Sequence, residues 1–353
     1  MKKVTLKDIS EQSGYSLVTV HRAINNKEGV SPEVREEILK LAERMGYTTN
    51  YIASALRRRQ VNVAIVMPRD VNKQYFHYIW EGYRAYAATI SQYNLNILEY
   101  TYTLNNADEQ LEVLNTLYYT KGHMLDGLLV TPEENSTSIE CIINKFCGKG
   151  IAVVLADNDF KDSGRLCCIA PNDEYTGRLA AEFMNFALSE KKGTVLVVKG
   201  SDASLSHEYN IRGFANYLKE HKSGLDVLCI DGTESLAKIK DEIKKVLQER
   251  KDIIAAYSVR ARNTIPICEA AVESGRANEL FIVGSDLFLE SSEMLKKGIL
   301  KVIVYKNPYQ KGYTAFMTLF EHLIKGVDPK KDVLYVPISL ILQNNIKFYE
   351  DFI

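Results

Sequence analysis

Short apolar runs alternate with longer amphipathic stretches along most of the chain, from Val61 onward. Runs of this length, rich in Val, Ile and Leu, are typical of buried parallel strands, and the stretches between them have the spacing of surface helices. The runs are residues 62–68, 95–102, 126–132, 151–157, 194–200, 225–232, 253–259, 280–286 and 301–307. Strand–helix alternation predicts a doubly wound α/β fold, and the length of this region predicts two such lobes.

The N-terminal segment has a different pattern, with three short helical stretches in place of strands. Thr5 and Asp8 have the form of a capping box, and Gly14 ends the first stretch. Ser16 and Ser31 are predicted caps of the second and third helices. Only two residues separate the first two helices, a spacing typical of a helix-turn-helix. The side chains expected to face inward are Leu6, Ile9, Val20, Ala23, Ile24, Val34, Ile38, Leu41 and Met45.

The second helix leaves one face directed outward, and residues near its start are where a recognition helix meets base edges in the major groove. An Arg pairs bidentately with a guanine edge, and apolar side chains contact thymine methyl groups. The outward side chains are Leu17, Val18, Thr19, His21 and Arg22. The alternative is a small helical domain with a solvated Arg and His, because helix-turn-helix patterns are short.

Composition and charge narrow the class of protein. The chain has 353 residues, 46% of them hydrophobic and 25% charged, which excludes a disordered protein and suggests about two to three domains. The net charge of −1 conceals an asymmetry. Residues 1–60 carry 11 basic and 7 acidic side chains, whereas the rest carries 33 and 38. A basic segment on a mildly acidic body indicates that only the N-terminal part meets a polyanion.

Targeting signals and metal-ligand spacings are not seen in the sequence. No apolar run reaches the roughly 18 residues of a membrane span, and the N-terminus lacks the apolar core of a signal peptide. We therefore expect a soluble, cytoplasmic protein that binds no membrane. The cysteines form no C-x-x-C pair, so structural thiols are expected, with no metal site and no cofactor. They are Cys141, Cys147, Cys167, Cys168, Cys229 and Cys268.

Polar residues follow several of the predicted strands directly. Open α/β sheets bind ligands outside the carboxyl ends of their strands. This rule selects Arg69, Asp70, Asp157, Asn158, Arg260, Asp286 and Lys306. Tyr75, Phe76 and Trp80 begin the helix after the first strand, where aromatic rings could stack on a ligand. The alternatives are that these aromatics belong to the core and that Asp157 and Asp286 cap the following helices.

Five motifs follow one another in the N-terminal segment: T-x-K-D-I at 5–9, G-x-S-x-x-T-V at 14–20, R-x-I-N at 22–25, V-S-P-E-x-R at 30–35 and G-Y-x-x-N-x-x-A-x-x-L at 46–56. In this order they resemble the DNA-binding head of the lactose-repressor (LacI/GalR) family. The resemblance implies DNA contacts for Thr5, Ser16, Leu17, Val18, Thr19, His21, Arg22 and Asn25. The chain departs from the family at His21, Thr49 and Ser54, where Ser, Pro and Arg are usual.

A short basic stretch links this head to the body. Residues 50–59 are fewer than the roughly 12–15 that make an isolated helix stable in water, so we expect them to fold only against DNA. The resemblance implies a hinge helix in the minor groove, with Leu56 wedged between base pairs. The implied contacts are Asn50, Ala53, Leu56 and Arg57. A solvated linker is the alternative for the three consecutive arginines.

Further motifs lie in the body: N-x-x-[YF]-F at 72–76, R-G-F at 212–214, V-G-x-D at 283–286 and P-x-Q-x-G at 308–312. They resemble the type I periplasmic sugar-binding fold that the same family carries. The resemblance implies a ligand pocket of Tyr75, Phe76, Asp157, Asn158, Asn210, Arg260, Asp286 and Lys306. Three of these residues depart from the family, which usually has Arg for Asn210, Asn for Arg260 and Gln for Lys306.

The predicted organisation is a head, a hinge and a two-lobed body. The boundaries are 1–48 for the helix-turn-helix domain, 49–60 for the hinge and 61–353 for the ligand-binding and dimerisation domain. Within the body, lobe 1 is expected at about 61–158 plus 288–306, and lobe 2 at about 159–285 plus 309–345.

Together these features predict a DNA-binding transcription regulator, a homodimer on a pseudo-palindromic operator and a repressor of carbohydrate genes. A sugar is the expected effector. A sugar acid or a phosphorylated sugar becomes the better choice if Asp157 and Asp286 do not neutralise Arg260 and Lys306. The alternatives are a regulator that responds to a non-sugar ligand, and a cytoplasmic sugar-binding protein or enzyme that does not bind DNA. The chain lacks a phosphate-binding loop and a G-x-S-x-G elbow, so no enzymatic activity is expected.

Overall fold

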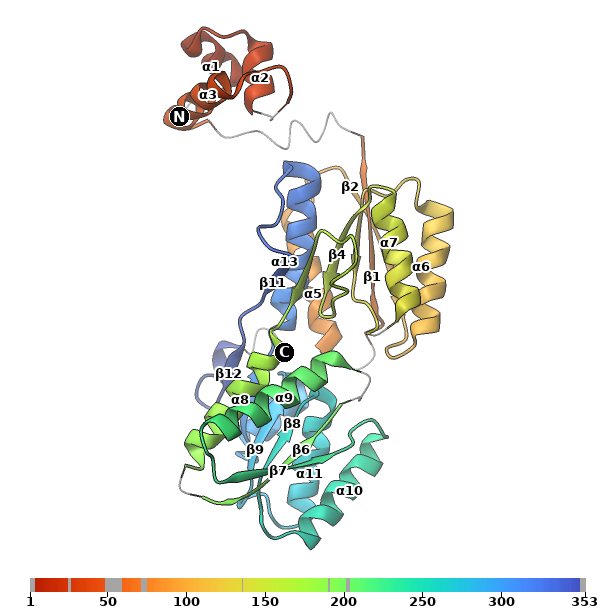
Figure 1. Cartoon of the computed structure of the whole chain (residues 1–353), viewed down its shortest axis with the longest axis vertical. Helices are drawn as coiled ribbons and strands as arrows, with labels where there is room; N and C mark the ends of the chain where they lie inside the picture. Colours follow the sequence, from red (N-terminus) through yellow and green to blue (C-terminus); the bar gives the residue numbers. More distant parts are fainter. Residues whose placement is uncertain are drawn as a thin grey trace. The chain divides into compact units, whose positions relative to one another are not determined.

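The computed structural model describes residues 4–24, 27–47, 59–70, 75–134, 136–189, 191–200 and 204–349. The chain divides into two compact units, residues 1–59 (the head) and 60–353 (the body) (Figure 1). Asn25 and the predicted hinge positions Asn50, Ala53, Leu56 and Arg57 lie outside the described residues. Within the described ranges, no helix is long and apolar enough to cross a membrane.

Three helices form the head: α1 (Leu6–Ser13), α2 (Leu17–Ile24) and α3 (Pro32–Arg44). The predicted capping box is confirmed, because Thr5 Oγ1 accepts from the Asp8 amide and the Asp8 carboxylate accepts from the Thr5 amide. Gly14 ends α1 in the left-handed conformation, with φ of 75°. The buried core of the head consists of Ile9, Val20, Ala23, Ile38 and Ala42. Four of these are predicted inward residues.

The body contains two six-stranded sheets. The first has the order β11-β5-β4-β3-β1-β2 and is parallel throughout. Its strands are β1 (Val61–Pro68), β2 (Leu95–Tyr102), β3 (Gly127–Val130), β4 (Ala152–Ala156), β5 (Cys167–Ala170) and β11 (Val333–Tyr335). All four apolar runs between residues 62 and 157 are strands of this sheet. We call it, with its helices, lobe 1.

The second sheet has the order β12-β10-β9-β8-β6-β7, and only β12 is antiparallel to its neighbour. Its strands are β6 (Gly193–Val198), β7 (Leu225–Ile230), β8 (Ile253–Ser258), β9 (Phe281–Ser285), β10 (Leu300–Tyr305) and β12 (Ser339–Ile341). This sheet and its helices form lobe 2. The two-lobed α/β prediction is therefore confirmed, and the remaining five predicted strands are present.

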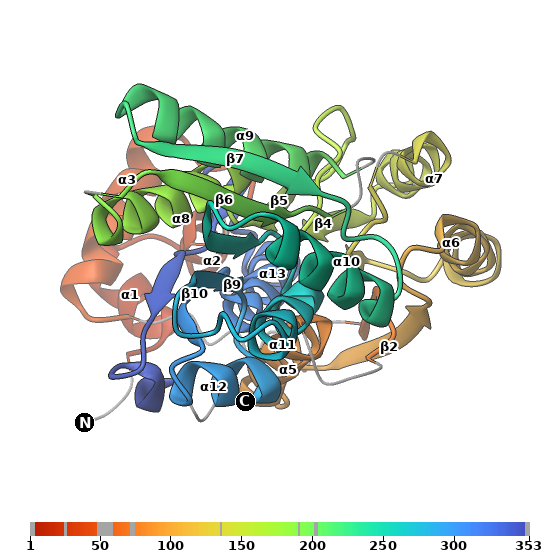
Figure 2. The same cartoon turned by 90° about the horizontal axis from the view of Figure 1, so that it is seen from below.

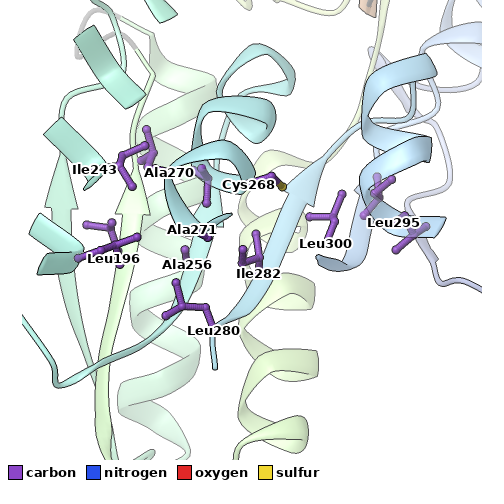
Figure 3. Close-up of a cluster of buried hydrophobic side chains, with 14 of the residues drawn as sticks. Leu196, Ile243, Ala256, Cys268, Ala270, Ala271, Leu280, Ile282, Leu295 and Leu300 are labelled. Atoms are coloured by element: carbon purple, nitrogen blue, oxygen red, sulfur yellow. The ribbon is translucent and has the colours of Figure 1, made fainter. Parts of the chain in front are cut away.

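Helices cover both faces of each sheet. In lobe 1, α5 (Tyr75–Thr89) and α13 (Pro308–Phe320) bury one face, and α6 (Ala107–Lys121) and α7 (Thr137–Gly148) bury the other. In lobe 2, α8 (Asp173–Ala187) and α9 (Leu205–Glu220) lie on one face. The other face carries α10 (Leu236–Glu249), α11 (Thr264–Glu273) and α12 (Leu289–Lys296), an arrangement visible in Figure 2. Figure 3 shows the apolar core beneath these three helices.

The lobe boundaries differ from the prediction, which placed residues 159–170 in lobe 2, 288–306 in lobe 1 and 309–345 in lobe 2. The strand β5 belongs to lobe 1, where it pairs with β4 and β11. The strand β10 pairs with β9 in lobe 2, and α13 packs on α5 in lobe 1. The reason is that the chain passes between the lobes three times, after β5, after β10 and after β11, and the alternation of strands and helices does not mark these passages.

Close helix contacts fix the start of α13 and of α8. A Cβ added at Gly312 would lie 1.9 Å from the Ile79 carbonyl oxygen, and one at Gly82 would lie 1.9 Å from that of Tyr309. In lobe 2, a Cβ at Gly177 would lie 1.8 Å from the Asn210 carbonyl oxygen. Only glycine permits backbones to approach so closely. These contacts hold the first turns of α13 and α8 beside the neighbouring helices of their lobes.

Candidate functional site: a cavity between the two lobes

A cavity of about 660 Å³ lies between the lobes, at the carboxyl ends of their strands. Its volume is within the range of small-molecule sites. Nine of the residues predicted from strand ends or from the family pocket line it: Arg69, Asp70, Tyr75, Phe76, Asp157, Asn158, Arg260, Asp286 and Lys306. Their roles in binding stay predictions, but the structure brings them to one place.

Two predicted residues have other surroundings. Asn210 is buried in α9, where its Oδ1 accepts a hydrogen bond of 2.8 Å from the Tyr257 hydroxyl, and it does not line the cavity. Trp80 is buried in lobe 1, and its indole N–H donates to the Pro68 carbonyl oxygen at 2.8 Å. Of the two interpretations of Trp80, the core one holds.

A buried polar cluster joins Asp157, Tyr75 and Lys311 in lobe 1. The Lys311 ammonium, which is inaccessible to solvent, donates to Asp157 Oδ1 and to the Tyr75 hydroxyl. The Tyr75 hydroxyl also donates to Asp157 Oδ1. Burial raises the pKa of Asp157 to about 7 and lowers the pKa of Lys311 well below its ordinary value. The cluster occupies Oδ1 of Asp157 and leaves Oδ2 to accept from a ligand.

A second ion pair lies on the lobe 2 side. The Lys306 ammonium is 3.1 Å from Oδ2 of Asp286, and the Lys306 backbone amide donates to Oδ1 at 3.0 Å. Burial lowers the pKa of Lys306, but Asp286, Asp173 and Asp157 outweigh it and leave this pKa raised. Lys306 is therefore neutralised by Asp286. This is the pairing expected for a neutral sugar ligand, as opposed to an acidic one.

Positive φ angles at the strand ends direct these carboxylates into the cavity region. Asp157 has φ of 75° and Asp286 has φ of 58°. Asp adopts the left-handed region more readily than most residues, and such angles cluster at functional sites. The two acids therefore end strands β4 and β9 with a sharp turn. The helix-capping alternative is not observed for either residue, because their side chains pair with lysines.

Arg260 and Asp173 are among the groups that line the cavity and have no partner of opposite charge at ion-pair distance among the described residues. Arg260 follows β8, and burial lowers the pKa of its guanidinium. Asp173 is the first residue of α8, and burial raises the pKa of its carboxyl well above the ordinary value, against the influence of Lys306. The Asp173 carboxyl also forms no hydrogen bond within the part of the chain that the structure describes. Both groups remain available to a ligand.

Glu134 connects the two lobes across the cavity. Its Oε1 accepts from the Ser204 and Ser206 hydroxyls at 2.9 and 3.0 Å, and its Oε2 accepts from the Ser206 amide at 3.4 Å. Glu134 follows β3 of lobe 1, whereas Ser204 caps α9 of lobe 2. We call this group the Glu134 latch.

Sequence reasoning missed several residues of the site. Lys311 could have been found as a Lys within the apolar stripe of α13, four and eight residues before Ala315 and Leu319. Glu133 and Glu134 follow a predicted strand, so the strand-end rule could have selected them. Asp173 carried no chemical signal of its own in the sequence.

In the head, α2 presents its outward residues on the surface. Leu17 and Val18 are 49% and 60% exposed, and His21 and Arg22 are exposed as well. The Ser16 hydroxyl accepts from the Thr19 amide at 3.1 Å and so begins the helix. Arg35 on α3 donates to the carbonyl oxygens of Arg22, Ala23 and Lys27, which fixes the end of α2. The head thus holds a short helix with its first turn exposed.

Two family models match the chain. The one described as "Periplasmic binding protein domain" matches residues 63–326, about three quarters of the chain. The one described as "Bacterial regulatory proteins, lacI family" matches residues 5–50. The matches cover the body and the head, respectively.

Curated relatives align along most of their length. Catabolite control protein A of Staphylococcus epidermidis is 25% identical over 276 residues, which are 77% of this chain and 78% of the relative. Catabolite control protein A of Priestia megaterium is 22% identical over 328 residues, 91% of this chain and 93% of the relative. The second alignment therefore extends over nearly the whole chain.

Solved structures share the fold of the body. GanP, a glucose-galactose binding protein from Geobacillus stearothermophilus, superposes with a TM-score of 0.71 at 22% identity, over 82% of this chain and 99% of its own. A putative LacI transcriptional regulator from Bacteroides fragilis also gives a TM-score of 0.71, at 18% identity, over 82% of this chain and 100% of its own.

Proposed function

The chain belongs to the lacI family of bacterial regulatory proteins, with a body of the periplasmic binding protein domain family, and from this we propose how it regulates transcription. It binds DNA through the head, and a small ligand between the lobes controls its operator affinity. The observation that carries the proposal is the exposed first turn of α2 on a capped three-helix core. Relatives of this chain include proteins named HTH-type transcriptional regulators, so we propose no catalytic role.

The proposed DNA contacts of the head are Thr5, Ser16, Leu17, Val18, Thr19, His21, Arg22 and Asn25. The proposed hinge contacts are Asn50, Ala53, Leu56 and Arg57. We propose a homodimer on a pseudo-palindromic operator, since a two-fold protein matches two-fold half-sites. Repression is the proposed mode, because a bound protein at an operator excludes other proteins from the same DNA.

The proposed effector is a polyhydroxy compound of the sugar class. Asp157 and Asn158 line the cavity, and Asp157 Oδ2 and Asn158 Oδ1 accept no hydrogen bond from any described residue. The Nδ2 of Asn158 donates to the Pro132 carbonyl oxygen at 2.9 Å. Hydroxyl groups need such acceptors, and Arg260 supplies donors. The sugar-binding role of the structural neighbour GanP supports the same class.

The test is selection of DNA sequences by the full chain, followed by gel-shift titration. The proposal expects one palindromic sequence, bound by two protomers, at an affinity that Arg22→Ala weakens by about 1–3 kcal/mol per half-site. Arg44→Ala removes the same charge from the end of α3 and is the matched control. The proposal is overturned if the chain binds all DNA sequences equally and both variants weaken this binding alike, because only non-specific DNA affinity would then remain.

A further inference from the structure

The charges of the cavity are unbalanced in favour of carboxyl groups. The residues that line it include six carboxyl groups but only four Lys or Arg side chains. The six acids are Asp70, Glu133, Glu134, Asp157, Asp173 and Asp286. Lys311 does not line the cavity but pairs with Asp157, so it adds one cation to the count. Arg69 is subtracted from the count, because it pairs with Glu109, which does not line the cavity. The surplus therefore stays at two carboxyl groups.

Pairing removes most of these acids from consideration. Asp157 is neutralised by Lys311, Asp286 by Lys306, and Asp70 lies 2.6 Å from Nδ1 of His77. Glu134 accepts three hydrogen bonds in the latch. Glu133 accepts from the Asn105 amide at 2.7 Å, and Arg260 acts on it electrostatically. Asp173 remains as the cavity carboxyl that forms no hydrogen bond with any described residue.

Asp173 also lies where added negative charge is least tolerated. Asp157, Glu134 and Asp286 all act on it electrostatically, and Lys306, the one cation that does so, is already paired with Asp286. A ligand carboxylate or phosphate would add a further negative charge to this group of acids. A ligand ammonium would instead supply the missing positive charge and donate hydrogen bonds to a free carboxylate.

We propose that the effector is an amino sugar, a polyhydroxy compound with a primary amine, whose ammonium binds the carboxylate of Asp173. In this arrangement Asp157 Oδ2 and Asn158 accept from its hydroxyls, and Arg260 donates to its oxygens. This inference rests on the proposed function, because it names the ligand class of the same cavity. It favours an amine over the sugar acid that Arg260 by itself suggests.

The experiment uses the full chain and matched sugars. Isothermal titration compares the 2-amino, 2-hydroxy and 2-acetamido forms of the gluco, galacto and manno rings, together with the three uronates. One amino sugar is expected to bind roughly 10- to 100-fold more tightly than its 2-hydroxy and 2-acetamido counterparts, as expected for a charge-assisted hydrogen bond. Its binding should release protons to the buffer, because an ammonium favours the ionised form of nearby carboxyls.

Two variants assign the effect to one residue. Asp173→Asn should reduce the amino-to-hydroxy affinity ratio to about one while the hydroxy form still binds, since only the charge is removed. Glu174→Gln removes a neighbouring charge in the same helical turn, outside the cavity, and should leave the ratio unchanged. The proposal is wrong if no amino sugar binds at millimolar concentration, if a neutral sugar or a uronate binds as tightly, or if Asp173→Asn keeps the ratio.

The same titrations, repeated with operator DNA present, separate the two proposals. A neutral sugar that changes DNA affinity would overturn the amine proposal and leave the regulatory function standing. An amino sugar that binds through Asp173 without any change in DNA affinity would support the amine proposal and overturn the regulatory function.

Discussion

The ammonium of Lys311 contacts the carboxylate of Asp157, a residue 154 positions earlier in the chain. Lys311 lies in the first turn of α13, after the chain has returned from lobe 2, and Asp157 ends β4 of lobe 1. Tyr75 completes the cluster and has two cations near its ring, with Lys311 Nζ 4.2 Å and Lys306 Nζ 5.2 Å from the ring centroid. The contact thus joins α13 to the end of β4, beside two residues that line the cavity, Asp157 and Tyr75.

Replacing Lys311 with Met is expected to destabilise the body by about 3–5 kcal/mol, because it leaves the Asp157 charge buried without its partner. The double variant Lys311→Met/Asp157→Asn should recover most of this loss. Calorimetry of the full chain measures the effect. Lys325→Met breaks a more exposed pair with Glu321 and should change the stability by less than about 1 kcal/mol. A single variant as stable as the parent would show that the contact does not hold the lobe.

The Glu134 latch should hold the two lobes together beside the cavity. Glu134→Ala removes three hydrogen bonds to a charged group, and even one such bond contributes about 1.5–3 kcal/mol. We expect a larger radius of gyration by small-angle X-ray scattering and weaker effector binding. Ser204→Ala tests the latch from the lobe 2 side, because Ser204 donates to Glu134 and also caps α9. Its control is Ser235→Ala, which removes the cap of α10 without touching Glu134. Equal scattering from Glu134→Ala and the parent would rule out the latch.

The stability of the ligand-free body should fall as the pH rises, in part because of Asp173. Burial raises the folded-state pKa of this carboxyl above its ordinary value of 3.8. The folded protein thus holds the proton more tightly, so the stabilisation is complete below pH 3.8 and is lost as the pH rises through the raised pKa. Denaturant titrations of Asp173→Asn should show a shallower decline, whereas Glu174→Gln should follow the parent. Parallel pH profiles for Asp173→Asn and the parent would contradict this.

Arg35 is expected to maintain the shape of the DNA-reading helix. Its guanidinium donates to three carbonyl oxygens at and beyond the end of α2, with distances of 2.6 to 3.3 Å. Arg35→Met should increase amide exchange in residues 17–24 and weaken specific DNA binding by about 1–3 kcal/mol, as for other charged hydrogen-bond donors. Arg44→Met removes an equal charge from α3 and serves as control. Unchanged exchange in both variants would show that Arg35 is dispensable for α2.

The positions of most strands and of several helix ends could be predicted from the sequence. Periodicity located nine of the strands, and Thr5, Gly14 and Ser31 marked helix ends by side-chain rules that act within a few residues. The strands β11 and β12 have three residues each and are defined by their neighbours in the sheet, so periodicity could not identify them. The strand β5, with four residues, was missed although β3 is equally short. Cys229 is exposed although its run is apolar, because β7 is an edge strand.

The cavity was predictable in part. The strand-end rule selected Asp157 and Asp286 because it depends only on the direction of parallel strands. It could not show that Lys311 rather than Arg260 pairs with Asp157, because that contact depends on the second passage of the chain between the lobes, which returns it from β10 to α13. Asn210 was assigned by family position, whereas its bond to Tyr257 makes it part of the lobe 2 interior.

The most direct measurement is the affinity of the full chain for its selected operator, by fluorescence anisotropy, with and without the sugar that binds the cavity most tightly. A ligand can change the DNA affinity only as far as it binds the DNA-bound and the DNA-free protein with different affinities. We expect the ligand to change the operator affinity by about 5- to 150-fold, as is typical of allosteric coupling. Asp286→Asn should abolish both ligand binding and this change. A ligand that binds in an Asp286-dependent manner and leaves the operator affinity unchanged would contradict this expectation.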